Sequence, residues 1–152
     1  MNMRTLLRRA VPVAALLTLA ACATTRPPAI EFLTPLGKPL GPFSHAVRVG
    51  DILYLAGQIG TDSTGALVSG GIEAETRQTM RNIETVLKKT GSSMDRVVKC
   101  TAMLADMKEW PAMNTVYATF FPVNKPARSA LGANGLALNA RVEIECIAVV
   151  AR

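Results

Sequence analysis

Few side chains in this sequence have the type and spacing that chemistry requires. Arg128 follows Pro126, and because proline cannot donate to a strand ladder, the arginine is expected at the start of a strand, where a cleft can open. A guanidinium there could hold a carboxylate through two parallel hydrogen bonds. Glu143 and Glu145 alternate onto one face of a later strand, and either could accept a proton. The competing interpretation is structural: a surface ion pair for the arginine, and solvated or interface carboxylates.

Other kinds of site are not predicted. His45 is the single histidine, and no nucleophile or metal-spaced cysteine accompanies it, so neither a catalytic triad nor a zinc site is expected. The sequence has no glycine-rich phosphate loop and no dinucleotide fingerprint, so no cofactor and no metal are predicted. Cys100 and Cys146 fall on apolar strand faces and are interpreted as small buried residues. They would pair only in an oxidising compartment and only if their strands are neighbours.

The elements that must position these residues follow from hydrophobic periodicity. Helical spacing predicts one helix from Ile72 to Thr90, with Gly91 just beyond its end, and a second from about Pro111 to Phe121. Strands are predicted at Ala46–Val49, Ile52–Ile59, Val97–Leu104, Ala127–Leu131 and Arg141–Val150, the first two joined as a hairpin. This order indicates an α+β domain with both helices on one face of a mixed, mostly antiparallel sheet.

The second face of that sheet is too apolar to meet water. Ile52–Ala56 does not alternate at all, and the outer face of the last strand continues from its glutamates into Ile147 and Val149. Two helices can cover only one face of such a sheet. The simplest cover for the other face is a second copy of the chain, which would place a site between subunits.

The first residues are typical of an export signal. Three arginines and no acid precede an apolar run at residues 10–21, which is too short for a membrane-spanning helix. The run ends in Leu19-Ala20-Ala21-Cys22, which resembles the bacterial lipoprotein box, so lipid attachment is predicted at Cys22. The alternatives are an ordinary cleaved signal or an unusual soluble N-terminus. Residues 22–30 are then a lipid-anchored tether, and residues 31–152 are the folded domain.

The basic charge of the whole chain belongs largely to that signal. The 152 residues carry a formal charge of +6, and removing residues 1–21 takes away Arg4, Arg8 and Arg9 and no acid, which leaves +3. No stripe of basic and aromatic residues is evident, so nucleic acid is not a predicted partner.

Several short strings occur in a characteristic order along the chain. They are Gly41-Pro42-Phe43-Ser44-His45-Ala46-Val47, Ala56-Gly57-Gln58-Ile59-Gly60, Gln78 through Asn82, Met113-Asn114-Thr115-Val116-Tyr117, Pro126-Ala127-Arg128-Ser129 and Val142-Glu143-Ile144-Glu145-Cys146-Ile147-Ala148-Val149. Together they resemble the RidA family of reactive intermediate (enamine/imine) deaminases, once called YjgF and sometimes labelled endoribonuclease L-PSP. The resemblance covers about residues 41–150.

The resemblance implies a chorismate mutase-like α+β fold, a homotrimer with clefts between subunits, and hydrolysis of 2-imino acids to 2-oxo acids and ammonia. It implies that Arg128 binds the substrate carboxylate, that Glu143 orients the attacking water, and that Asn114 lines the cleft. Phe43 stands where many members have tyrosine, so it provides an apolar wall without a hydroxyl. Ala130 replaces a common cysteine, although its backbone groups could still bind substrate.

An alternative function on the same scaffold is an envelope module that binds small carboxylates, or acts as a chaperone, without turnover. Export motivates it, because the known sources of 2-aminoacrylate are cytoplasmic pyridoxal-phosphate enzymes. The predicted location is the bacterial envelope, facing the periplasm and attached to the membrane only through the lipid. Ala23 is not an aspartate, which favours the outer membrane.

Overall fold

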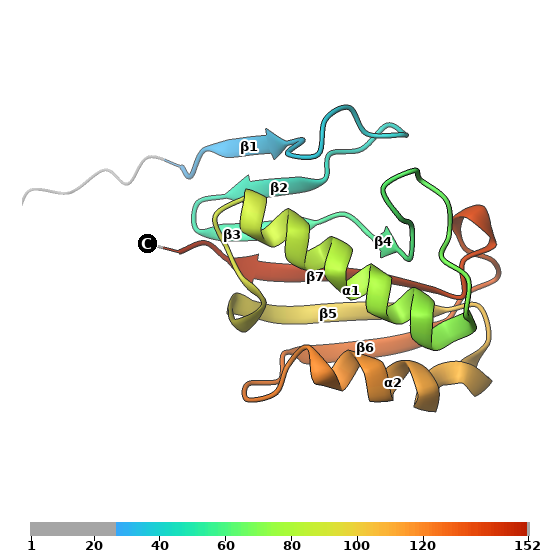
Figure 1. Ribbon diagram of the computed structural model, residues 1–152. Helices are drawn as coiled ribbons and strands as arrows, with labels where there is room; N and C mark the ends of the chain where they lie inside the picture. Colours follow the sequence, from blue (N-terminus) through green and yellow to red (C-terminus); the bar gives the residue numbers. More distant parts are fainter. Residues whose placement is uncertain (1–26, 152) are drawn as a thin grey trace, which may run out of the picture.

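Two helices lie on the same face of a seven-stranded sheet in the computed structural model of the chain, which describes residues 27–151 (Figure 1). Three short 3-10 turns, at Met94–Arg96, Met107–Glu109 and Ala137–Asn139, connect these elements. The helices are α1 (Gly71–Lys89) and α2 (Trp110–Thr119); the strands are β1 (Ile30–Leu33), β2 (Ala46–Val49), β3 (Ile52–Leu55), β4 (Gln58–Ile59), β5 (Val97–Leu104), β6 (Ala127–Gly132) and β7 (Val142–Val149).

The sheet is mixed and mostly antiparallel, as predicted. Its order is β1-β2-β3-β7-β5-β6, with β4 pairing β7 beyond the end of β3. Only β5 and β6 run parallel among the described strands. The crossover between these two strands carries α2, the connection that a parallel pair requires. Arg128 therefore lies on an edge strand, β6, and Glu143 lies on a central strand, β7.

Most predicted elements are present, with two differences. The hairpin is confirmed by the antiparallel register of Ala46 with Leu55. The strand expected over Ile52–Ile59 is divided, because the chain leaves the ladder at Ala56 and Gly57 before β4 pairs with β7. The first strand, β1, was not predicted, because its exposed and irregular residues give no alternating pattern.

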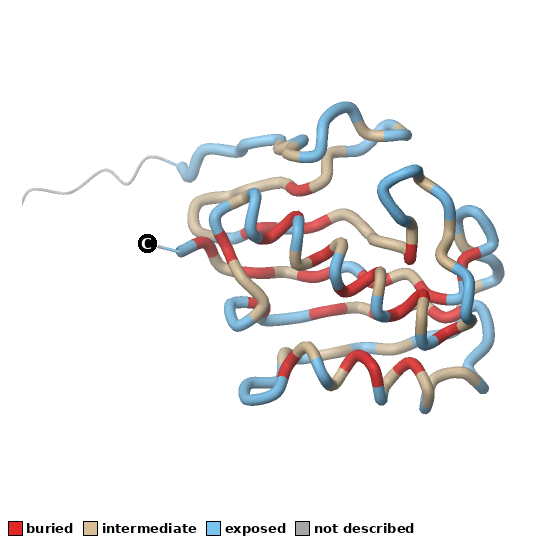
Figure 2. Tube along the Cα trace, viewed as in Figure 1, coloured by how far each residue is buried: buried red, intermediate tan, exposed pale blue. Residues whose placement is uncertain are grey.

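The core lies between the helices and one face of the sheet, where buried segments of α1, β5 and β7 face each other (Figure 2). In β7 the predicted inner face, Val142, Ile144, Cys146 and Ala148, is buried throughout. The buried face of α1 is also the predicted one, and Gly91 adopts φ +81°, as a residue just past a helix end commonly does.

The opposite face of the sheet has no cover within the described chain. Ile52 and Tyr54 of β3 are 40% and 45% exposed, while their neighbours Leu53 and Leu55 are buried against the helices. The strand therefore alternates in burial although it does not alternate in hydrophobicity. This is the pattern expected when the outward-facing apolar side chains of a strand contact another molecule.

A disulfide joins Cys100 and Cys146, which the sequence predicted to be small buried residues able to pair only if their strands are neighbours. Cys100 of β5 and Cys146 of β7 are directly opposite in the antiparallel register, and their Cα atoms are 4.1 Å apart. This short separation fits a pair whose backbone groups hydrogen-bond to other strands. Both residues are at least 98% buried, so the bond crosses the core side of the sheet.

Replacing both cysteines by alanine is expected to lower the free energy of unfolding by about 2–4 kcal/mol, because the bond closes a loop across 46 residues of sequence in the unfolded chain. Chemical denaturation of the two proteins without reductant measures the difference. Adding dithiothreitol during unfolding should bring the wild-type midpoint toward that of the variant and leave the variant unchanged. Equal midpoints without reductant would contradict a formed disulfide.

The predictions for the signal at residues 1–21, for Cys22 and for most of the tether concern positions outside the described residues. Within residues 27–151, neither helix has the length and apolar character needed to cross a membrane.

Candidate active site

Arg128 is held at the edge of the sheet without an acidic partner. Its Nη2 donates a hydrogen bond of 2.8 Å to Oδ1 of Asn114 on α2, so the structure brings together these two predicted site residues. Its guanidinium also lies over the rings of Trp110 and Tyr117 on the same helix. Among residues 27–151, no carboxylate lies within 4 Å of this half-buried cation. Within the described residues, Arg128 therefore does not form the surface ion pair that was its structural alternative.

Ala130, two residues further along β6, offers backbone groups at the same edge. Ala133 donates its N–H to the carbonyl of Leu104 on β5 at 2.8 Å. Because alternate residues of a strand direct their backbone groups to opposite sides, the N–H and C=O of Ala130 point away from β5. β6 is the last strand of the sheet, so these groups and the Arg128 side chain are available together at an open edge.

Glu143 lies on the other face of the sheet. Arg128 is in register with Cys100, and Cys100 with Cys146, so these three side chains share the face that the helices cover. Glu143 is an odd number of residues from Cys146 and therefore points to the uncovered face. The carboxylate packs against Gly57, where a Cβ atom would collide with Glu143 Oε1.

The two glutamates that the sequence could not separate have different surroundings. Burial, and then the neighbouring charge of Glu145, raise the pKa of Glu143 above its ordinary value. Glu145 is exposed and lines a shallow hollow with Tyr54 and Lys99. A carboxyl group with a raised pKa accepts a proton more readily at neutral pH, which makes Glu143 the better candidate for a general base.

Gly57 gives the Glu143 carboxylate its space, and a Gly57→Ala variant should show this. The new methyl group would force the flexible end of Glu143 into another rotamer, while the backbone of Gly57 is in a region open to alanine. We expect at least a 10-fold fall in any reaction that uses Glu143, with a small change in thermal stability. Gly65→Ala is no suitable control, because its φ of +86° strains any side chain. Ala56→Ser, at the adjacent position, is the matched control and should keep most activity.

Phe43 lies away from the other predicted residues. It is 49% exposed in the loop before β2 and makes an edge-to-face contact with His45, their ring centroids 6.4 Å apart. β2 and β6 are near opposite ends of the sheet, so Phe43 and Arg128 do not meet within one chain. The predicted site residues thus form three separate groups. Arg128, Asn114 and Ala130 lie at the β6 edge, Glu143 lies on the open face of the sheet, and Phe43 lies in the loop before β2.

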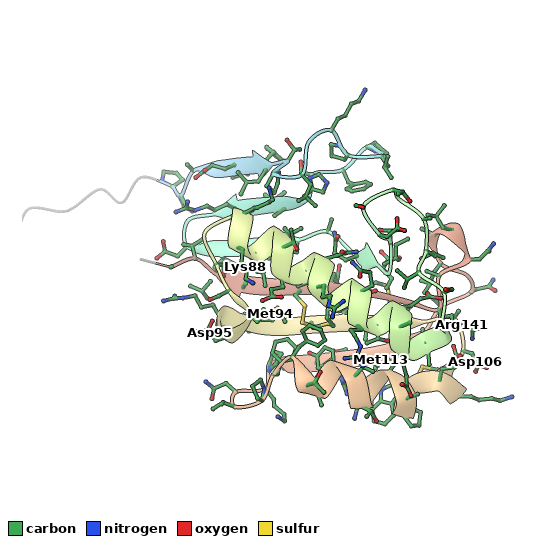
Figure 3. The ribbon with its side chains drawn as sticks, in the orientation of Figure 1. Lys88, Met94, Asp95, Asp106, Met113 and Arg141 are labelled. Atoms are coloured by element: carbon green, nitrogen blue, oxygen red, sulfur yellow. A yellow bond between two sulfur atoms is a disulfide. The ribbon has the colours of Figure 1, made fainter. Side chains whose placement is uncertain are left out.

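A network of charged side chains joins the N-terminal ends of α1 and α2. Arg141, just before β7, donates its backbone N–H to the buried Glu75 of α1 at 2.8 Å and pairs through its side chain with Glu75 and Glu109. Asp106 caps the turn before α2 by accepting from the N–H of Lys108 at 2.9 Å. Arg141 and Asp106 lie at the end of the molecule where α1 and α2 begin (Figure 3). The network therefore sets the position of Trp110, the first residue of α2.

Two sets of contacts at the candidate site residues were not predicted from the sequence. Trp110 and Tyr117 lie over Arg128, Gly57 packs against Glu143, and no role was predicted for any of these three residues. The spacing of Trp110, Asn114 and Tyr117, at i, i+4 and i+7, could have revealed the first, because it places all three on one helix face. Within the described residues, no group of three or more histidine, cysteine or acidic side chains is arranged to hold a metal ion.

Residues 35–150 match the family described as Endoribonuclease L-PSP. The chain belongs to that family, the RidA or endoribonuclease L-PSP family. It is 44% identical over 112 residues to a RutC family protein of Pyrococcus horikoshii, which covers 73% of this chain and 89% of the relative. It is 43% identical over 111 residues to the 2-iminobutanoate/2-iminopropanoate deaminase of Mus musculus, which covers 72% of this chain and 82% of the relative.

Solved structures of the RidA family have the same fold. A Rid family protein of Yersinia pestis, YyfA, has a TM-score of 0.75 at 37% identity and covers 80% of this chain and 100% of its own. RidA from an Antarctic Psychrobacter has a TM-score of 0.71 at 29% identity and covers 82% of this chain and 99% of its own. The α+β fold expected from the resemblance is confirmed.

Proposed function

We propose that this RidA family member hydrolyses 2-imino acids, and their enamine tautomers, to 2-oxo acids and ammonia. The observation that carries the proposal is the half-buried Arg128 guanidinium, which is fixed by Asn114 at an open sheet edge and has no carboxylate partner in the described chain. Such a group is suited to bind the carboxylate of a small anionic substrate. Relatives at 41–43% identity are named 2-iminobutanoate/2-iminopropanoate deaminases, which supports the reaction type.

In the proposed reaction, Arg128 and the outward backbone groups at Ala130 hold the carboxylate, which fixes the imine carbon. Glu143 accepts a proton from a water molecule as the water oxygen bonds to that carbon, and it returns this proton to the imine nitrogen, which gives the carbinolamine and regenerates the carboxylate. The resulting carbinolamine transfers a proton to its nitrogen, the C–N bond breaks with the electron pair leaving on ammonia, and the C=O bond of the 2-oxo acid forms. Water supplies both the oxygen and the protons, so the step balances without a redox partner.

We further propose that the complete site forms between copies of the chain, in a homotrimer. Arg128 and Glu143 lie on opposite faces of one sheet, so a single chain cannot offer both to one small substrate. A partner that packs its β6 edge on the open face of its neighbour would bring an arginine to a glutamate and cover Ile52 and Tyr54. Analytical ultracentrifugation of the domain tests this: a monomer at micromolar concentration would exclude it.

The reaction is tested with imine generated in place. An L-amino-acid oxidase produces 2-iminobutanoate from 2-aminobutanoate, and semicarbazide competes with water for the imine. Adding the purified domain, residues 27–152, which keeps β1 whole, should lower semicarbazone formation in proportion to the enzyme concentration and release 2-oxobutanoate and ammonia in equal amounts. No change in semicarbazone yield at micromolar protein would reject the activity.

We also propose export to the bacterial envelope, with a lipid on Cys22. The residues before Cys22 support this, as does the Cys100–Cys146 disulfide, because structural disulfides persist mainly in oxidising compartments. Mass spectrometry of the protein from its native host should find a mature chain that begins at a diacylated Cys22. A chain that retains residues 1–21 in the cytoplasmic fraction would contradict the proposal.

A further inference from the structure

One face of α2 contacts the Arg128 guanidinium at three successive positions. Trp110, Asn114 and Tyr117 follow one another at i, i+4 and i+7, so their side chains form a stripe along the helix. Arg128 Cζ lies 5.7 Å from the centroid of the Trp110 ring and 4.6 Å from that of the Tyr117 ring, and Asn114 accepts a hydrogen bond between them. A single helix face therefore fixes the arginine.

These contacts leave the guanidinium free to bind an anion. A guanidinium has five N–H donors, and Asn114 accepts from one nitrogen, Nη2. Aromatic faces attract the cation without accepting in the plane of its donors, so Trp110 and Tyr117 restrain it while its N–H groups stay available. A carboxylate partner in the same place would have occupied two of those donors.

The Tyr117 hydroxyl contributes nothing to this arrangement. Tyr117 is 6% exposed, and its hydroxyl is buried without a hydrogen-bond partner among the described residues. Burial raises the pKa of Tyr117 to about 12, although the Arg128 charge lowers it, so the ring stays neutral at physiological pH. The Tyr117 ring also packs against the Phe121 ring, with the two ring centroids 5.0 Å apart, and this contact holds the Tyr117 ring in place. Tyr117 therefore acts on Arg128 through its ring face.

We infer that Trp110 and Tyr117 are positioning residues that hold the Arg128 fork ready for a substrate carboxylate, and thereby set affinity for the acid rather than the rate of the chemical step. The inference rests on the proposed function only in the choice of ligand, a small 2-oxo or 2-imino acid. An unrestrained arginine side chain would lose several freely rotating torsions on binding, and an arginine already held by two rings loses less.

The chain contains its own probe of this site, because Trp110 is its only tryptophan. The test is a fluorescence titration of the purified domain with 2-oxobutanoate, the stable product. We expect a saturable change in Trp110 emission in the wild type and no change in Arg128→Gln. Arg77→Gln, which removes an exposed arginine of α1, is the charge-matched control and should titrate like the wild type.

The position-specific test compares two variants at Tyr117. Tyr117→Phe keeps the ring and removes the hydroxyl, so Kd and KM should stay within about twofold of wild type. Tyr117→Leu keeps apolar volume and removes the ring face, so Kd and KM should rise about 5- to 30-fold with kcat changed less than about twofold, as expected for a desolvated cation–π contact. If phenylalanine weakens binding as much as leucine, or if kcat falls as much as KM rises, the inference is wrong.

A second position keeps the test decisive if Tyr117→Leu fails to fold. Trp110 is partly exposed, so Trp110→Leu should fold, and calorimetry with 2-oxobutanoate replaces the lost fluorescence. We expect weaker binding in Trp110→Leu and recovery in Trp110→Phe; equal affinity in wild type and Trp110→Leu would overturn the inference. A wild-type protein that binds 2-oxobutanoate but does not hydrolyse imines would reject the proposed function and leave this inference standing.

Discussion

Replacing Arg128 with glutamine should reduce kcat/KM for 2-iminobutanoate by about 100- to 10,000-fold. Two charge-assisted hydrogen bonds to the substrate carboxylate would be lost, each contributing about 1.5–3 kcal/mol, and the imine carbon would no longer be fixed for attack. Arg128→Lys keeps the charge but not the planar fork, and should recover only a small part of the activity. The semicarbazide competition assay measures both variants.

The control for Arg128 is Arg77→Gln, an equal change of charge on an exposed part of α1. It should retain activity within a factor of about two, because Arg77 is exposed and forms no hydrogen bond or ion pair with the Arg128 site among the described residues. Circular dichroism and sedimentation should show that Arg128→Gln keeps its fold and oligomeric state. An Arg128→Gln enzyme with more than a third of wild-type activity would remove Arg128 from the mechanism, even if the enzyme is a deaminase.

Replacing Glu143 with glutamine should lower kcat by about 100- to 10,000-fold, the range that general-base catalysis contributes. The loss should come without loss of stability. The folded-state pKa of Glu143 is raised, so the ionised carboxylate opposes folding above that pKa, and its removal should leave the unfolding midpoint at pH 7 equal or slightly higher. Thermal denaturation at pH 7 and steady-state kinetics separate the two effects.

The pH profile distinguishes Glu143 from Glu145. Wild-type activity should decline in acid as Glu143 becomes protonated, at a pH above the ordinary glutamate pKa, because burial and Glu145 both raise it. Glu145→Gln removes one of these causes, so the acid limb should move to lower pH while kcat near pH 8 stays close to wild type. If Glu145→Gln abolishes activity and Glu143→Gln does not, the two roles are reversed.

Local sequence patterns were sufficient for most of the elements. The apolar period of α1, its glycine after the last turn, and the alternating residues of β7 predicted a helix and a strand that the structure contains. These patterns report which face of an element is buried, because burial removes apolar surface from water wherever the element is placed. β1 carried no such pattern, since it is an exposed edge strand that hydrogen-bonds to β2.

Sequence also predicted that the two helices would leave one face of the sheet to be covered by another copy of the chain, and Ile52 and Tyr54 are exposed on that face within the single chain. It named Arg128, Asn114 and Glu143, and only the first two prove to be neighbours. Alternation along a single strand could not tell Glu143 from Glu145. The two carboxylates differ because Gly57, 86 residues earlier in the chain, has no side chain and so leaves space for the carboxylate of Glu143.

The residues of this chain thus determined its secondary structure, its family resemblance and the kinds of side chain that could do chemistry. Tertiary structure alone decided that Cys100 faces Cys146 across two strands, that α2 places two rings on Arg128, and that Arg128 and Glu143 lie on opposite faces of the sheet. The physical reason is that periodicity fixes the direction of a side chain relative to its own element, whereas a site depends on register and packing between elements that are distant in sequence.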